Sequence, residues 1–355
     1  MDEVWVPTEA SAAVLRESGV ARRLVVVPLA VDTQELDRSR VQPLSLPPPN
    51  AMQVFGPRTS RKPSFIFISV FKWELRKGYD VLMRAFLEEF SPEPRQQSAT
   101  VEQFRVTGPG NAVEARATGP AARAAIAGRR KGPAKAAEGP CSDKSDVVLY
   151  LLTKPFLPKA SGAGLAEHVR KWARDAQPEL DLNQVPRVYV MDGHVPRKDY
   201  VAMLAAADAF VLATRGEGWG LPILEAMSLG LPVIATNWSG PTAYLDERVG
   251  YPLSYSLKPV PSTEPYWFQG SQWAEPSVPH LRRLMRAIVS CSGRADAKAR
   301  GEAALQRVQE RFAQPVVSRL VAAELHRIAS TTRGPRPTPG LLGADGLSES
   351  GSRSG

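Results

Sequence analysis

Residues 209–227 read Ala209-Phe-Val-Leu-Ala213-Thr-Arg-Gly-Glu217-Gly-Trp-Gly-Leu-Pro222-Ile-Leu-Glu225-Ala-Met227, and this stretch decides the fold. Its first five residues form an apolar run that is typical of a buried parallel strand. Pro222 suits the first position of a helix, where its missing N–H has no partner to lose. Residues 214–221 are therefore predicted to form a strand-to-helix loop. In doubly wound sheets such loops lie at the carboxyl ends of the strands, where ligands bind.

The loop and the helix that follows it carry two carboxylates, Glu217 and Glu225, eight positions apart. Gly218 and Gly220 allow the backbone to approach a ligand closely, and the helix start offers free N–H groups and a positive dipole end. Ionised carboxylates accept strong hydrogen bonds from sugar hydroxyls. The pattern indicates a site for a phosphorylated sugar. A second interpretation stays open, in which Glu225 only complements the helix dipole and Glu217 is a solvated loop residue.

Outside this stretch, short apolar runs rich in β-branched and aromatic residues alternate with helical patterns. The predicted strands are Phe65–Phe71, Val147–Leu152, Val188–Met191, Ala209–Ala213 and Val233–Thr236. The predicted helices are Tyr79–Phe90, Leu165–Ala176, Lys198–Ala206, Pro222–Leu229 and Pro241–Asp246. Such repeats predict an α/β fold, a Rossmann-like doubly wound parallel sheet. After about residue 274 only a helical region is expected, over Pro279–Ser290, Ala295–Phe312 and Pro315–Ser330.

Composition limits the class of protein. The 355 residues are 43% hydrophobic, which is ample for a packed core. The only cysteines, Cys141 and Cys291, lie far apart and indicate neither a disulfide framework nor a zinc site. No apolar run is long enough to cross a membrane, and the first residues lack the pattern of a signal peptide. A cytoplasmic protein without a transmembrane segment is predicted.

The formal net charge of +9 is concentrated in one segment. Residues 95–144 hold nine basic and four acidic side chains, are rich in Ala, Gly and Pro, and show no sustained apolar period. We therefore interpret residues 95–145 as a disordered basic insertion and residues 331–355 as a disordered tail. The alternative is a nucleic-acid-binding role for Gly128-Arg-Arg-Lys-Gly132, but no nucleic-acid partner is predicted.

Five segments follow one another in the order known from one enzyme family: Ser69–Leu82, Val190–Pro196, Ala206–Leu212, the E-x7-E segment Glu217–Glu225, and Leu231–Gly240. Together they resemble the carboxyl-terminal nucleotide-sugar domain of the family 4 glycosyltransferases, retaining enzymes of the two-domain architecture called GT-B. The resemblance covers roughly residues 60–90 and 146–330. It implies that the chain is the carboxyl-terminal, donor-binding half of such an enzyme.

The resemblance also implies residue roles. Glu225 matches the residue that binds the ribose hydroxyls, and Glu217 matches the one near the donor sugar. Lys77 and Lys72 match a basic pair on the donor diphosphate, although the family usually has Arg at the position of Lys72. The catalytic candidates are Glu217, Lys77 and Lys72, and the donor-binding candidates are Glu225, Gly218, Trp219, Gly220, Leu221, Gly193, His194 and Val195. Two alternatives stay open: both lysines are ordinary solvated side chains, and His194 contacts no ligand.

The opening residues, from Glu3 to Asp32, resemble the end of the family's amino-terminal domain and the crossing into the second domain. We accordingly predict a domain remnant and hinge over residues 1–31 and a nucleotide-sugar-binding domain over residues 32–330. The implied activity is transfer of a hexose from a nucleotide-sugar donor to an unknown acceptor with retention of configuration. No metal or other cofactor is expected, because lysines and a helix dipole take the place of a divalent cation. The alternative is a catalytically inactive nucleotide-sugar-binding or scaffold module derived from a truncated glycosyltransferase.

Overall fold

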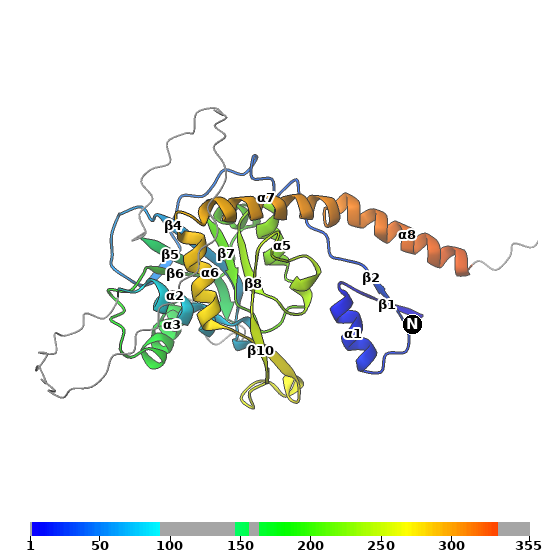
Figure 1. The fold of residues 1–355 in the computed structure, drawn as a ribbon, viewed down its shortest axis with the longest axis horizontal. Helices are drawn as coiled ribbons and strands as arrows, with labels where there is room; N and C mark the ends of the chain where they lie inside the picture. The colour runs from blue at the N-terminus through cyan, green and yellow to red at the C-terminus, as the bar shows by residue number, and fades with distance from the viewer. Residues whose placement is uncertain (1, 93–145, 156–162, 333–355) are drawn as a thin grey trace, which may run out of the picture.

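The computed structural model describes residues 2–92, 146–155 and 163–332 (Figure 1). The predicted insertion over residues 95–145 and all but the first two residues of the predicted tail lie outside the described residues. The central sheet has seven strands: β3 (Met52–Phe55), β4 (Phe65–Trp73), β5 (Val147–Pro155), β6 (Val188–Asp192), β7 (Ala209–Leu212), β8 (Val233–Thr236) and β9 (Tyr251–Leu253). Their order is β3-β6-β5-β4-β7-β8-β9, and only the β3–β6 pairing is antiparallel.

Six helices pack around this sheet in the described part of the chain (Figure 1): α2 (Tyr79–Phe90), α3 (Ala163–Ala176), α4 (Arg197–Ala206), α5 (Leu221–Ser228), α6 (Val278–Val289) and α7 (Arg294–Arg311). Helix α8 (Gln314–Thr332) follows α7 and extends away from the sheet (Figure 1). Helix α5 begins at Leu221, one residue before the expected start, with Gly220 in the left-handed region at φ 87° and Pro222 in the first turn. Every residue of β7 and of β8 is buried, and so are the first four residues of β6. This burial explains why the three strands have nearly uninterrupted apolar sequences. The predicted Rossmann-like α/β class is confirmed.

The order of the strands places a crevice between β4 and β7. From β4 the chain moves outward through α2 to β5 and through α3 to β6. It then returns through α4 to β7, beside β4, and moves outward in the opposite direction through α5 to β8. The loops after β4 and β7 therefore diverge, and ligands of open α/β sheets bind at such a switch point.

Some elements differ from the sequence-based expectation. The chain makes an antiparallel hairpin of β10 (Tyr255–Pro259) and β11 (Gln272–Pro276), which extends from one end of the molecule (Figure 1). Four of the five residues of β10 are exposed, so the strand lacks the apolar pattern that predicts one. The predicted helix Pro241–Asp246 is only the short 3-10 turn η2 (Gly240–Ala243). Cys291, in the turn after α6, is disulfide-bonded, contrary to the expectation of no disulfide.

A small unit forms from the first residues. Strands β1 (Glu3–Val6) and β2 (Arg23–Val26) pair in parallel, and α1 (Glu9–Glu17) connects them. This unit lies beside α8 and apart from the central sheet (Figure 1). The Glu3 carboxylate receives two hydrogen bonds from Arg327 of α8, at 2.8 and 2.6 Å.

Candidate functional site

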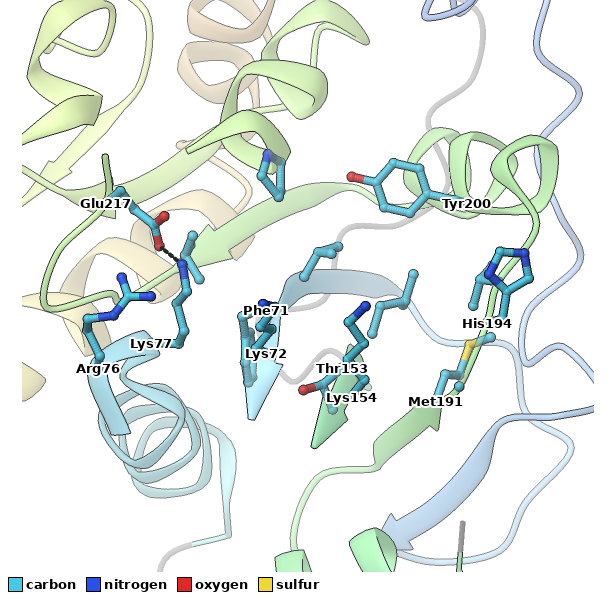
Figure 2. Close-up of a pocket in the computed structure, with 16 residues that line it drawn as sticks. Phe71, Lys72, Arg76, Lys77, Thr153, Lys154, Met191, His194, Tyr200 and Glu217 are labelled. Carbon is cyan, nitrogen blue, oxygen red and sulfur yellow. Dashed lines mark hydrogen bonds and ion pairs between the residues drawn. The ribbon is translucent and has the colours of Figure 1, made fainter. Parts of the chain in front are cut away.

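A cavity of about 710 Å³ opens at the carboxyl ends of β4, β5, β6 and β7. The loops that follow these strands line it, together with the first turn of α5 and one residue of α4 (Figure 2). Its wall includes six of the predicted site residues: Lys72, Lys77, Gly193, His194, Val195 and Glu217. The fold therefore brings together residues that are far apart in the chain, such as Lys72 and Glu217, which are 145 positions apart.

Lys77 and Glu217 form an ion pair at one end of the cavity (Figure 2). The distance from Lys77 Nζ to Glu217 Oε1 is 2.6 Å, and the two side chains are only 15% and 9% exposed. Lys77 ends the 3-10 turn η1 (Leu75–Lys77) after β4, whereas Glu217 lies in the loop after β7. The pair thus joins the two sides of the switch point and places a cation and a carboxylate, bonded to each other, in the wall of the cavity.

Close backbone packing sets the position of Lys77. Gly78 has a φ of 68°, and a Cβ atom at this position would overlap the carbonyl oxygen of Ala213 at the end of β7. Arg76 adds a hydrogen bond of 2.6 Å to the carbonyl oxygen of Gly216. Only glycine allows both the left-handed conformation and the approach of the two loops. Its presence explains why Lys77 meets Glu217.

Arg215 connects the same two loops through hydrogen bonds. Its buried guanidinium makes paired hydrogen bonds to Asp80 in α2, both at 2.8 Å, and to Glu275 in β11, at 2.6 and 3.0 Å. It also donates to the carbonyl oxygen of Leu75 in η1. Although burial opposes it, these carboxylates raise the pKa of Arg215 above its usual value. Arg215 therefore remains charged and ties the turn that carries Lys77 to the loop that carries Glu217.

The glycine-rich loop leaves three backbone donors free. The carbonyl oxygen of Glu217 accepts hydrogen bonds from Gly240 N, at 2.9 Å, and from Ser239 Oγ, at 3.0 Å. Within the described part of the chain, no group accepts a hydrogen bond from the N–H groups of Gly218, Trp219 or Gly220. These donors lie next to the positive end of α5, which favours an anionic ligand.

Glu225 is held by two protein donors. Arg197 Nη1 lies 2.6 Å from Glu225 Oε1, and the hydroxyl oxygen of Tyr200 lies 2.5 Å from Glu225 Oε2. Arg197 also makes three hydrogen bonds of 2.8 to 3.1 Å to Glu35. Burial, reinforced by the charge of Glu225, raises the pKa of Tyr200 well above its usual value, so its hydroxyl remains a donor. Glu225 is positioned near the cavity through Tyr200, which lines it.

The predicted site residues do not all face the cavity. Glu225, Gly218, Trp219, Gly220 and Leu221 are not among the residues that line it. The side chain of Trp219 is buried and packs on Tyr244 and Phe312, with ring centroids 5.3 and 5.6 Å away. The indole of Trp219 therefore cannot contact a ligand in this cavity without repacking. Its backbone N–H is the part of Trp219 that can bind a ligand.

Four polar residues that line the cavity were missed by sequence reasoning: Arg76, Thr153, Lys154 and Tyr200. Lys154 is the next-to-last residue of β5, as Lys72 is of β4. This position at the end of an apolar strand is the clearest sequence signal by which any of the four could have been found. Tyr200 lies in α4, one turn after the Gly193 loop, but no local motif predicts its bond to Glu225. Among the described residues no group of three or more His, Cys, Asp or Glu side chains is arranged to hold a metal ion.

Comparison with known proteins supports a glycosyltransferase fold. Residues 162–255, which include Glu217 and Glu225, match the family described as "Glycosyl transferases group 1". A 45-residue stretch is 53% identical to O-antigen chain mannosyltransferase B of Escherichia coli; it covers 13% of this chain and 12% of that protein. Within the described residues, no helix is long and apolar enough to span a bilayer.

Solved structures resemble nearly the whole chain. Sucrose-phosphate synthase from Thermosynechococcus elongatus matches 93% of it with a TM-score of 0.53 and 16% identity. Anabaena HepE in complex with UDP and glucose matches 92% of it with a TM-score of 0.53 and 13% identity. The chain spans 59% and 63% of the lengths of these two proteins. The chain therefore shares the α/β fold of these two proteins, and its residues 162–255 are similar to the group 1 glycosyltransferases.

Proposed function

We propose that this chain supplies the donor-binding domain of a glycosyltransferase of family 4 type, which transfers a hexose from a nucleotide-sugar with retention of configuration. The observation that carries the proposal is the Lys77–Glu217 ion pair of 2.6 Å inside the switch-point cavity. A donor placed along the cavity has its sugar at Glu217 and its nucleobase at the Gly193 loop. The ribose hydroxyls then reach Glu225. Because HepE was solved with UDP and glucose, a UDP-sugar is the first donor to test.

Each residue has a chemical task in this proposal. Transfer breaks the bond between the anomeric carbon and the diphosphate oxygen, and the bonding electron pair leaves with the diphosphate. Lys72, Lys77 and the free N–H groups after Glu217 offset the negative charge that develops there. The Glu217 carboxylate binds sugar hydroxyls and stabilises positive charge on the sugar ring. The acceptor oxygen forms the new bond to the anomeric carbon, and its proton passes to the diphosphate oxygen that leaves.

Nucleotide binding tests the donor site directly. We expect UDP to raise the melting temperature of the parent chain, in EDTA as well as in Mg²⁺, because the lysines supply the positive charge. Glu225→Ala and Lys77→Ala should each reduce this shift strongly, since a lost hydrogen bond to a charged group reduces affinity by about tenfold or more. Matched controls are Glu247→Ala and Lys258→Ala, which alter exposed residues outside the cavity. The site assignment is wrong if all four variants respond to UDP as the parent does.

A second candidate is an inactive nucleotide-sugar-binding module. It is favoured by the state of Glu225, both of whose oxygens are already engaged by Arg197 and Tyr200. To bind Glu225, the ribose hydroxyls must displace Arg197 or Tyr200. A chain that binds UDP without displacing either donor would hold the nucleotide in a position from which no sugar is transferred. Release of UDP from UDP-sugars separates the two candidates. Turnover with an α-linked product from an α-linked donor, identified by NMR, supports the retaining enzyme, whereas binding without turnover supports the inactive module.

A further inference from the structure

Lys72 and Lys154 stand side by side in the floor of the cavity (Figure 2). They are direct partners in the parallel register of β4 and β5. Because neighbouring strands lie about 4.8 Å apart, two paired lysines at the strand ends extend into the same space. Neither makes a hydrogen bond or an ion pair with any residue that the structure describes.

The other charged groups of the cavity already have partners. Lys77 is paired with Glu217, at 2.6 Å, and Arg76 with Glu74, at 2.7 Å. Glu217 is the only carboxylate among the described residues that line the cavity. Within the described ranges, the exposed side chains of Lys72 and Lys154 therefore have no carboxylate as an ion-pair partner. Like charges directly opposite each other in a sheet are destabilising, so the pair has no role in stabilising the fold.

The position of the pair identifies the anion that would neutralise it. In Figure 2 both lysines lie between the Lys77–Glu217 pair and His194. The proposed function assigns the sugar to the first end and the nucleobase to the second, so the middle of the cavity takes the diphosphate. We propose that Lys154, which neither the family match nor the sequence motifs assign, binds this diphosphate together with Lys72. The inference rests on the proposed function, because that function orients the donor.

Lys154 also accounts for a feature of the sequence. Lys72 presents a point charge rather than the forked guanidinium that grips two phosphate oxygens at once. A second ammonium from the neighbouring strand provides a second contact from a separate direction. The two lysines together offer six N–H donors to the phosphate oxygens. We therefore expect phosphate binding to depend on the charge of Lys154 and not on its exact shape.

Inorganic pyrophosphate tests this contact without ribose, base or sugar. Calorimetric titration at low salt should show that Lys154→Gln weakens pyrophosphate binding by about tenfold, the usual loss when one hydrogen bond to a charged group is removed. Lys154→Arg should retain most of the affinity, because the charge is kept. Lys258→Gln is the matched control: Lys258 is an exposed strand lysine outside the cavity. Circular dichroism confirms that each variant is folded.

Uridine and UDP complete the test. Lys154→Gln should weaken UDP binding and leave uridine binding unchanged. The inference is overturned if the parent does not bind pyrophosphate, if Lys154→Gln and Lys258→Gln bind it equally, or if uridine binding falls as much as UDP binding. Failure of the proposed function has a different signature, because UDP binding then does not depend on Glu225 or Lys77 whatever Lys154 does.

Discussion

Single residues explain how the cavity acquires its charge. Lys77 and Glu217 are separated by 140 positions, and their contact depends on Gly78, which lets η1 lie against the end of β7. The resemblance to the family 4 glycosyltransferases was sufficient to nominate both partners from the sequence. Nothing local predicted that Glu225 would be occupied by Arg197, because that contact depends on where α4 lies against α5.

Replacing Gly78 tests this arrangement. Gly78→Ala requires a left-handed conformation and an overlap with the Ala213 carbonyl, so we expect it to destabilise the chain by at least about 1–3 kcal/mol and to weaken UDP binding. Gly164→Ala is the control, since a Cβ atom in that helical position meets nothing within 4 Å, and alanine should stabilise α3 by roughly 1 kcal/mol at most. Chemical denaturation measures both. Equal stability of the two variants would show that Gly78 is not required.

Among the elements, the buried strands were the easiest to predict. Strands β6, β7 and β8 are almost wholly apolar because both faces are covered, and their sequences record this. Strand β10 is mostly exposed and η2 is short, so neither element produces a periodic pattern of apolar residues in the sequence. Helix α7 buries Ala297, Gly301, Ala304 and Val308 at helical spacing, and a charged contact also ties it to the segment after η2. There Arg307 of α7 lies 3.0 Å from Asp246.

The contact between Asp246 and α7 predicts a pH dependence. Partial burial raises the pKa of Asp246, but hydrogen bonds from Arg248 and Arg307 outweigh this and lower it to about 2. The pKa is thus lower in the folded chain than in the unfolded chain, so the contact stabilises the fold above about pH 4 and is lost as the pH falls toward 2. Asp246→Asn should therefore destabilise the chain near pH 7 and progressively less below pH 4.

Urea denaturation at several pH values measures this difference. Glu247→Gln provides the matched control, because it removes a carboxylate at the next, exposed position. Its stability should follow that of the parent at each pH. A constant difference between Asp246→Asn and the parent from pH 7 to pH 3 would show that the ionised contact with Arg248 and Arg307 does not contribute.

At the scale of the whole molecule, the described residues form three sheets of unequal size, and the β1–β2 pair lies beside α8. The seven-stranded sheet holds most of the buried apolar residues, whereas the pair β1–β2 contributes Val6 and Val25 to the buried set. A two-stranded ribbon with little buried surface is marginally stable alone. The unit over residues 3–26 is anchored to α8 through Glu3 and Arg327.

Hydrogen exchange should separate these two parts. We expect the amides of β1 and β2 to exchange much faster than those of β4 and β5, because local unfolding is easiest where few apolar contacts are buried. Mass spectrometry of peptides covering residues 3–26, 65–73 and 147–155 measures the rates. Glu3→Gln should accelerate exchange in the first peptide and leave the others unchanged. Equal protection of all three would show that the chain unfolds as one unit.

The amino-acid sequence was enough to predict the α/β class and the strand-to-helix loop over residues 214–221, and to nominate most of the charged candidates. Each of these follows from patterns within about twenty residues, because periodicity and turn chemistry are local. The pairing of Lys72 with Lys154, the ion pair of Lys77 with Glu217 and the occupation of Glu225 by Arg197 emerge only in the folded chain. They depend on strand order and register, which the packing of distant segments determines.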